Sequence, residues 1–144
     1  MSSSRPSREG ALWVVGGALL RDGRCFSAQR PPGGSAGRKW EFPGGKVELH
    51  ETAVEALVRE MAEELDVEVR VGEFVGRSEF FAGDRLIVLD VYFVELLAGE
   101  PVLHEHLAFR WVNALELDSL DWAAADLPLL PRVRLELERR FDGA

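Results

Sequence analysis

Three glutamates, Glu60, Glu63 and Glu64, stand close together in the segment EFPGGKVELHETAVEALVREMAEELDV, residues 41–67. On a helix this spacing puts all three carboxylates on one face, within about 60° of Glu60 on either side. Like charges so placed destabilise a helix, and only Arg59 stands among them to offset the repulsion. Carboxylate oxygens are the ligands of Mg²⁺, which is commonly shared with substrate phosphates. The pattern therefore favours a divalent-cation site over a solvated acidic face.

A helix from Thr52 to about Leu65 carries these glutamates. Thr52 is the expected N-cap, and Glu55 three residues later completes a capping box. Helical winding puts Glu51 and Glu55 on the side away from the other acids, where we expect them to be solvated. The residues expected in the buried stripe of this helix are Val54, Leu57, Val58, Met61 and Leu65.

The remaining elements predict a mixed sheet between two helices. Residues 11–20 and 24–29 are typical of two strands around the turn RDG, and 67–81 and 85–97 of an antiparallel pair. Residues 107–113 predict another strand. The Pro/Gly-rich stretch 30–39 is a loop. Residues 127–141 predict a C-terminal helix whose start is delayed by Pro131.

Length and composition restrict the possible classes of protein. With 144 residues, 47% of them hydrophobic and 29% charged, the chain fits one globular domain, residues 11–144. It follows a polar tail, residues 1–10, that we expect to be disordered. The apolar runs are too short to cross a bilayer. A net charge of −8 argues against binding of duplex nucleic acid, and the single Cys25 fits a reducing cytoplasm.

The spacing from Gly45 to Val67 resembles the Nudix box, G-x5-E-x7-R-E-U-x-E-E-x-G-U, where U is a bulky aliphatic residue. Gly45, Glu51, Arg59 and the glutamates occupy the fixed positions, and Asp66 replaces the usual glycine. That glycine ends the helix in a left-handed conformation, which Asp tolerates better than most residues. The resemblance implies the α/β/α sandwich of Nudix hydrolases and hydrolysis of a nucleoside diphosphate linked to another group.

The same resemblance implies roles for the box residues. Glu63 and Glu64 would hold the metal, Mg²⁺ or Mn²⁺, and Glu60 would be a metal ligand or the base that deprotonates water. The carbonyl of Gly44, just before Gly45, would add a ligand. Arg59 would pair with box glutamates, which would make Glu51 and Gly45 structural.

Segments outside the box resemble the MutT-like branch, which cleaves nucleoside triphosphates to monophosphate and pyrophosphate. In ADLP, Asp126 matches a position beside the base, where it can hydrogen-bond a base edge; equally, it can simply cap the last helix. In EHLAFRWV, Glu105 is the acid expected to reach the metals. The flanking His104 and His106 are loop histidines, and such residues are more often solvated than in contact with substrate.

Further substrate-binding residues follow from the same branch. Arg30 stands where relatives place an arginine that meets the nucleotide phosphate, and Arg85 is a weaker candidate for which surface solvation is favoured. Phe42, like Trp40, can stack on the base or belong to the core.

Two substrates remain open within the branch: an oxidised purine such as 8-oxo-dGTP, in nucleotide-pool sanitation and DNA repair, or CTP or a modified dCTP. Cleavage of ADP-ribose or a dinucleoside polyphosphate, a non-catalytic nucleotide-binding module, and a structural protein with an acidic helix are the alternatives. A monomer and a homodimer are equally compatible with the sequence.

Overall fold

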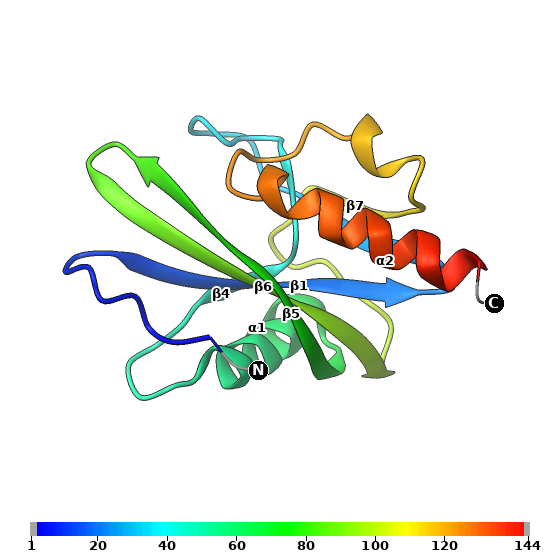
Figure 1. Ribbon diagram of the computed structural model, residues 1–144, viewed down its shortest axis with the longest axis horizontal. Helices are drawn as coiled ribbons and strands as arrows, with labels where there is room; N and C mark the ends of the chain where they lie inside the picture. Colours follow the sequence, from blue (N-terminus) through cyan, green and yellow to red (C-terminus); the bar gives the residue numbers. More distant parts are fainter. Residues whose placement is uncertain (1–2, 143–144) are drawn as a thin grey trace.

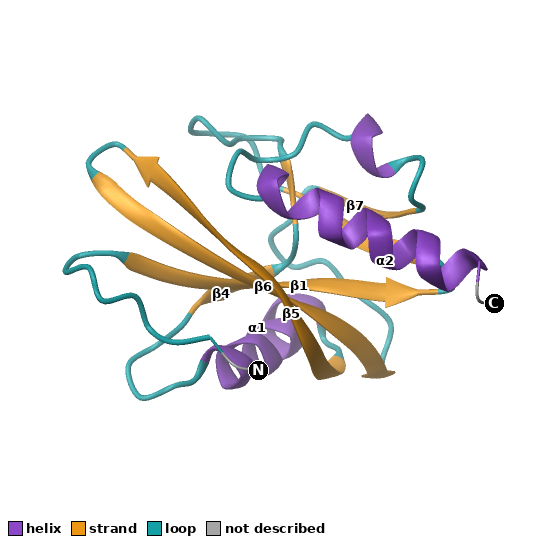
Figure 2. Ribbon diagram, viewed as in Figure 1, coloured by secondary structure: helices purple, strands orange, loops and turns teal. Residues whose placement is uncertain are grey.

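The computed structural model describes residues 3–142, which form one seven-stranded sheet and two long helices (Figures 1 and 2). The strands are β1 (Leu12–Arg21), β2 (Arg24–Gln29), β3 (Trp40–Glu41), β4 (Gly44–Lys46), β5 (Glu68–Ala82), β6 (Arg85–Ala98) and β7 (Ala108–Val112). The helices are α1 (Ala53–Leu65) and α2 (Leu130–Asp142), with two short 3₁₀ turns, η1 (Leu117–Ser119) and η2 (Leu127–Leu129).

The sheet is mixed, as predicted. Its order is β3-β2-β1-β6-β5, with β4 also paired to β1 and β7 to β2. β1 and β6 run parallel over eight residue pairs, while the other strand pairs are antiparallel, including the predicted β5–β6 pair. β1 is central, and its residues are buried on both faces, which explains why its sequence reads as an almost continuous apolar run.

One helix covers each face of the sheet (Figure 1). Leu57, Met61 and Leu65 of α1 pack in a core cluster with the β1 and β6 side chains of one face. Val133 and Leu137 of α2 belong to a second cluster on the opposite face. The predicted sandwich is therefore confirmed.

The buried stripe of α1 differs from the predicted one. Val58 is 39% exposed, whereas Ala53 and Ala56 are completely buried. The helix is rotated so that Ala53 and Ala56 face the sheet, and their small side chains allow a close approach of helix and strand.

Three predicted helix-end features are confirmed. Thr52 and Glu55 form the capping box at the start of α1. Asp66 ends α1 in the left-handed conformation, at φ 58° and ψ 33°. α2 begins only at Leu130, with Pro131 in its first turn and η2 before it.

The strand β4 was missed, because Gly44 and Gly45 read as a turn. The structure pairs them with Gly16 and Val15 of β1. A three-residue strand carries too few side chains to show an alternating pattern.

Residues 3–10 contain no helix or strand but contact the body of the protein. The backbone N–H of Ser3 donates to the Tyr92 hydroxyl over 2.6 Å, and Arg5 donates to the carbonyl of Glu48 over 2.8 Å. The first two residues of the predicted disordered tail, Met1 and Ser2, lie outside the described residues, and disorder of the tail stays a prediction.

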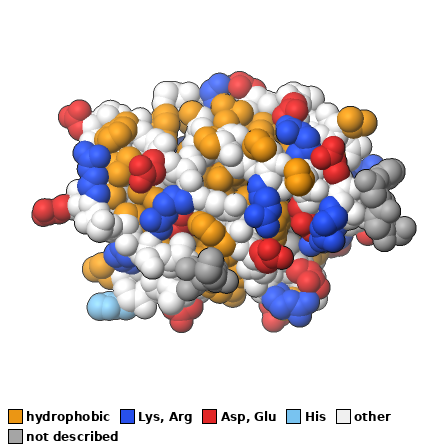
Figure 3. Space-filling model, in the orientation of Figure 1, with side chains coloured by type: hydrophobic (Ala, Val, Ile, Leu, Met, Phe, Trp, Pro, Cys, Tyr) orange, Lys and Arg blue, Asp and Glu red, His pale blue; other side chains and the backbone are white. Residues whose placement is uncertain are grey.

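Neither helix within residues 3–142 is long and apolar enough to cross a membrane. The face drawn in Figure 3 shows basic and acidic side chains interspersed with apolar ones.

Candidate metal centre and nucleotide site

Arg59 organises one acidic side chain before α1 and two in its second half. Its Nε and Nη2 donate to the two carboxylate oxygens of Glu51 over 2.7 and 2.9 Å, and Nη1 donates to Glu60 over 2.9 Å and to Glu63 over 3.2 Å. The hydrogen bonds from Arg59 and from the Glu48 N–H lower the pKa of Glu51 to about 2. The expectation that Glu51 is solvated is wrong, because Glu51 precedes the helix and turns back toward Arg59; the pairing implied by the Nudix resemblance is present.

Glu60 lies in a much less polar environment than Glu51. Its side chain is only 12% exposed. Burial raises its pKa to about 7, and Glu63 adds to this rise while Arg59 opposes it. A Cβ on Gly45 would come within 1.5 Å of Glu60 Oε2. The carboxylate of Glu60 therefore occupies the space that a side chain at position 45 would need.

Glu64 extends the acidic group toward the segment between β6 and β7. Its side chain is 19% exposed, and its pKa is raised by burial first and then by the charge of Glu105. Glu63 also contributes to this rise. Glu60 and Glu63 are therefore neighbours, as are Glu64 and Glu63 and Glu64 and Glu105; their joint role in a metal site stays a prediction.

The donor set fits a hard divalent cation, since it consists of neighbouring carboxylates, and the pKa values of two of them, Glu60 and Glu64, are raised. Within residues 3–142, however, no three acidic, histidine or cysteine side chains already converge as a complete ligand group. Arg59 holds Glu60 and Glu63 in the present arrangement, so side-chain rotations would have to accompany cation binding. Glu60, Glu63, Glu64, Glu105 and the Gly44 carbonyl are the groups that would hold the ion.

A second half of the site lies around Phe42 and Asp126. The Phe42 N–H donates to Asp126 Oδ1 over 3.1 Å, and the Phe42 ring lies 4.9 Å from that of Trp122. Asp126 is 4% exposed, and burial raises its pKa to about 8. Its side chain makes no capping hydrogen bond, so the simple capping role is wrong, because the carboxylate turns toward β3 instead.

Sequence reasoning missed Glu41, whose carboxylate contacts both Arg30 and His106. Arg30 Nη1 donates to Glu41 Oε1, and His106 Nε2 lies on Glu41 Oε2, each over 2.9 Å. The signal was available in WEFPGG, where an acid stands directly before Phe42. Arg30 therefore lies beside the acidic group, bonded to Glu41.

Two other residues considered from sequence lie apart from these contacts. Arg85 donates to the carbonyl of Gly10, at the turn between β5 and β6. His104 lies on Asp66 at the end of α1.

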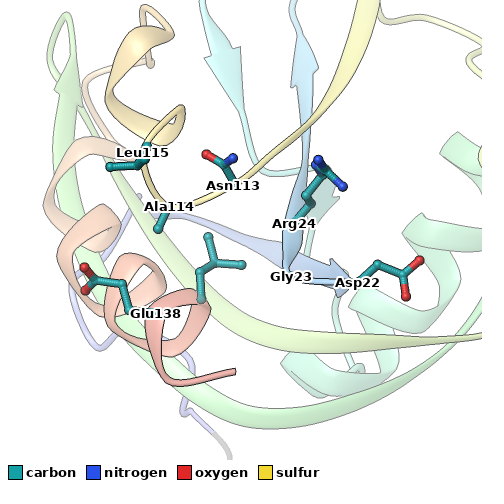
Figure 4. Close-up of a pocket in the computed structure, with 8 residues that line it drawn as sticks. Asp22, Gly23, Arg24, Asn113, Ala114, Leu115 and Glu138 are labelled. Carbon is teal, nitrogen blue, oxygen red and sulfur yellow. The ribbon is translucent and has the colours of Figure 1, made fainter. Parts of the chain in front are cut away.

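Figure 4 shows a hollow on the molecule whose lining includes none of the acidic group. It lies between the turn joining β1 to β2, the segment after β7 and the C-terminal part of α2. The residues lining it are Asp22, Gly23, Arg24, Asn113, Ala114, Leu115, Leu137 and Glu138. None of the predicted site residues is among them.

A family model described as the NUDIX domain matches residues 12–133. The chain belongs to the NUDIX domain family. Among curated relatives, the CTP pyrophosphohydrolase of Escherichia coli K12 is 41% identical over 117 residues, covering 81% of this chain and 87% of the relative. The putative 8-oxo-dGTP diphosphatase 2 of Mycobacterium tuberculosis H37Rv is 44% identical over 116 residues, covering 78% and 81%.

Solved structures agree with this assignment. The E. coli ORF135 protein superimposes with a TM-score of 0.78 at 39% identity, covering 85% of this chain and 88% of that one. The MutT Nudix hydrolase of Burkholderia pseudomallei gives 0.76 at 28% identity, covering 87% and 99%. The fold of this Nudix domain is therefore that of MutT proteins.

Proposed function

We propose that this Nudix domain hydrolyses a nucleoside or deoxynucleoside triphosphate to the monophosphate and pyrophosphate, with Mg²⁺ as its metal and Mn²⁺ as a possible replacement. The observation that carries the proposal is the group of Glu60, Glu63 and Glu64 on one helix, two of them with raised pKa. Burial of several carboxylates is costly unless a cation joins them.

The bound metal would neutralise phosphate oxygens and lower the pKa of attacking water. Glu63 and Glu64 would hold it, with Glu105 and the Gly44 carbonyl. Glu60 is either a further ligand or the group that takes the proton from water, a role that suits a carboxyl with a pKa near neutrality. Arg59 would keep these side chains oriented through Glu51.

The nucleotide base would lie near Phe42 and Asp126. At pH 7 a carboxyl with a pKa of about 8 is mostly protonated, so Asp126 can both donate and accept a hydrogen bond at the base edge. Arg30 would approach the phosphate, and its bond to Glu41 keeps it beside the acidic group. Arg85 would contribute only if the turn between β5 and β6 reached the nucleotide.

The preferred substrate in this proposal is an oxidised purine such as 8-oxo-dGTP, in cleaning of the nucleotide pool before DNA synthesis. CTP or a modified dCTP is the second candidate, because one of the relatives is named a CTP pyrophosphohydrolase. A cytoplasmic setting would suit either substrate and the one buried thiol, Cys25.

The test is a kinetic comparison of 8-oxo-dGTP, dGTP, CTP and 5-methyl-dCTP with Mg²⁺, analysing the phosphate products. The proposal expects pyrophosphate and a nucleoside monophosphate, with the highest kcat/KM for 8-oxo-dGTP. A higher value for a cytidine nucleotide would select the second candidate. Release of inorganic phosphate, or no turnover of any of the four, would contradict the proposed reaction.

A further inference from the structure

His106 differs from the other two histidines in being buried beside the acidic group. Its side chain is 6% exposed, whereas His50 and His104 lie at the surface. It follows Glu105 directly in the segment between β6 and β7. A buried polar ring needs partners for both nitrogens.

One nitrogen of the ring is firmly bonded. Nε2 lies 2.9 Å from Glu41 Oε2, and the other oxygen of Glu41 accepts from Arg30 over 2.9 Å. Because a carboxylate oxygen accepts, Nε2 is the donor in this contact. The ring is thus fixed from the side of β2 and β3.

The other nitrogen is buried and has no hydrogen-bond partner. This atom, Nδ1, lies 4.0 Å from Glu64 Oε2. A hydrogen bond requires about 2.7–3.2 Å, so a movement of roughly 1 Å would form one.

Glu64 lacks the hydrogen bonds that Arg59 gives to neighbouring acids. Within the part of the chain that the structure describes, the hydrogen bonds of Arg59 reach Glu51, Glu60 and Glu63 but not Glu64. The nitrogen atom that faces Glu64 is Nδ1 of His106.

We propose that His106 is a positioning residue for Glu64: held by Glu41 through Nε2, the ring pairs with the Glu64 carboxyl through Nδ1 and fixes that side chain for metal binding. The inference rests on the proposed function, since it assigns His106 a part in the same site. It also connects the Arg30 side of the nucleotide site to the metal side through one buried ring.

The decisive measurement is Mn²⁺ binding to the substrate-free protein, followed by electron paramagnetic resonance of the free ion. Four variants are compared: His106→Ala, His106→Asn, His106→Gln and, as the matched control on the same segment, His104→Ala. The Asn amide nitrogen takes the place of Nδ1, whereas the Gln amide nitrogen takes that of Nε2 and preserves the Glu41 contact.

Loss of a residue that orients a metal ligand typically costs about 10–100-fold in affinity or activity. We expect His106→Ala and His106→Gln to weaken Mn²⁺ binding about 10-fold or more, His106→Asn to recover part of the loss, and His104→Ala to match the wild type. At saturating metal, kcat should fall while KM for the nucleotide changes little. If His106→Ala does not fold, His106→Gln serves in its place.

Mn²⁺ affinities of His106→Ala or His106→Gln equal to that of His104→Ala would overturn the positioning role, as would a larger loss in His106→Asn than in His106→Gln. Wild-type protein that binds no Mn²⁺ would overturn this inference together with the metal site. Wild-type protein that binds Mn²⁺ but hydrolyses no nucleoside triphosphate would overturn the proposed function alone.

Discussion

Two glutamates that share Arg59 have opposite pKa shifts. Hydrogen bonds lower the pKa of Glu51 to about 2, whereas burial raises that of Glu60 to about 7. Arg59 makes a two-point contact with Glu51 and only a single hydrogen bond to Glu60. The two glutamates thus differ although their side chains are chemically the same. Glu51 stays ionised and orients Arg59, whereas Glu60 is able to exchange a proton.

Glu60→Gln tests this division of roles. Because the amide cannot take a proton and binds a cation more weakly than a carboxylate, we expect kcat to fall about 100-fold or more. Steady-state kinetics on the preferred nucleotide measures the loss. Glu138→Gln, an exposed change at the end of α2, is the control. Turnover of Glu60→Gln equal to that of the control would refute both roles given to Glu60.

Asp126→Asn addresses the buried carboxyl that accepts from the Phe42 N–H. A folded-state pKa of about 8 lies above the ordinary value of 3.8, so the folded protein holds a proton that the unfolded chain releases. The contribution of Asp126 to stability is therefore fully present below about pH 4 and is lost as the pH rises toward 8, on the order of 1 kcal/mol per pH unit.

The asparagine can still accept from the Phe42 N–H but does not titrate. We expect urea unfolding to show a flatter stability profile between pH 5 and pH 8 for Asp126→Asn than for the wild type, with the variant gaining most at pH 8. Parallel profiles would mean that Asp126 is ionised throughout this range.

Local sequence signals predicted helix α1 well, because capping, spacing and charge all act within a few residues. The capping box, the left-handed Asp66 and the shared face of the glutamates are of this kind. The contact of Glu41 with His106 and that of Phe42 with Asp126 span 65 and 84 positions of sequence. No periodicity encodes such pairs, since they depend on how β3 meets the segments before β7 and α2.

Gly45 of strand β4 lies against the Glu60 side chain, and its substitution tests whether Glu60 must keep its observed position. In Gly45→Ala the new Cβ would meet the end of the Glu60 side chain, which can rotate away. The fold should therefore tolerate the methyl group while the Glu60 carboxylate is displaced. We expect kcat to fall at least about 10-fold, the range seen when a metal-site side chain loses its orientation.

Thermal unfolding and kinetics are measured together on Gly45→Ala and on Gly72→Ala. At Gly72 the added Cβ would make only one ordinary contact, at 3.4 Å from the Phe93 carbonyl. Full activity in Gly45→Ala would show that Glu60 need not occupy the observed position.

The molecule as a whole is tied together by a buried charge that lies outside the proposed nucleotide site. Asp90 is completely buried in β6. It accepts from Arg77 of β5 over 2.7 and 2.9 Å and from the indole nitrogen of Trp13 in β1 over 2.7 Å. Arg77 also donates to the carbonyl of Ser4. The network thus connects three neighbouring strands with the N-terminal segment, and its signal in sequence was a lone acid in the apolar run LIVLDVYFV.

Asp90→Ala would leave the Arg77 charge and the Trp13 N–H without their acceptor. Breaking a buried ion pair costs about 3–5 kcal/mol, because the remaining charge stays in a poorly solvated place. Glu95→Ala is the matched control on the same two strands: its pair with Arg70 is more than 60% exposed on both sides, and such pairs contribute about 1 kcal/mol or less. Urea unfolding should therefore separate the two variants by about 2 kcal/mol or more. Equal losses would mean that Arg77 swings out to water when Asp90 is removed, and that the strands and the N-terminal segment are held by packing alone.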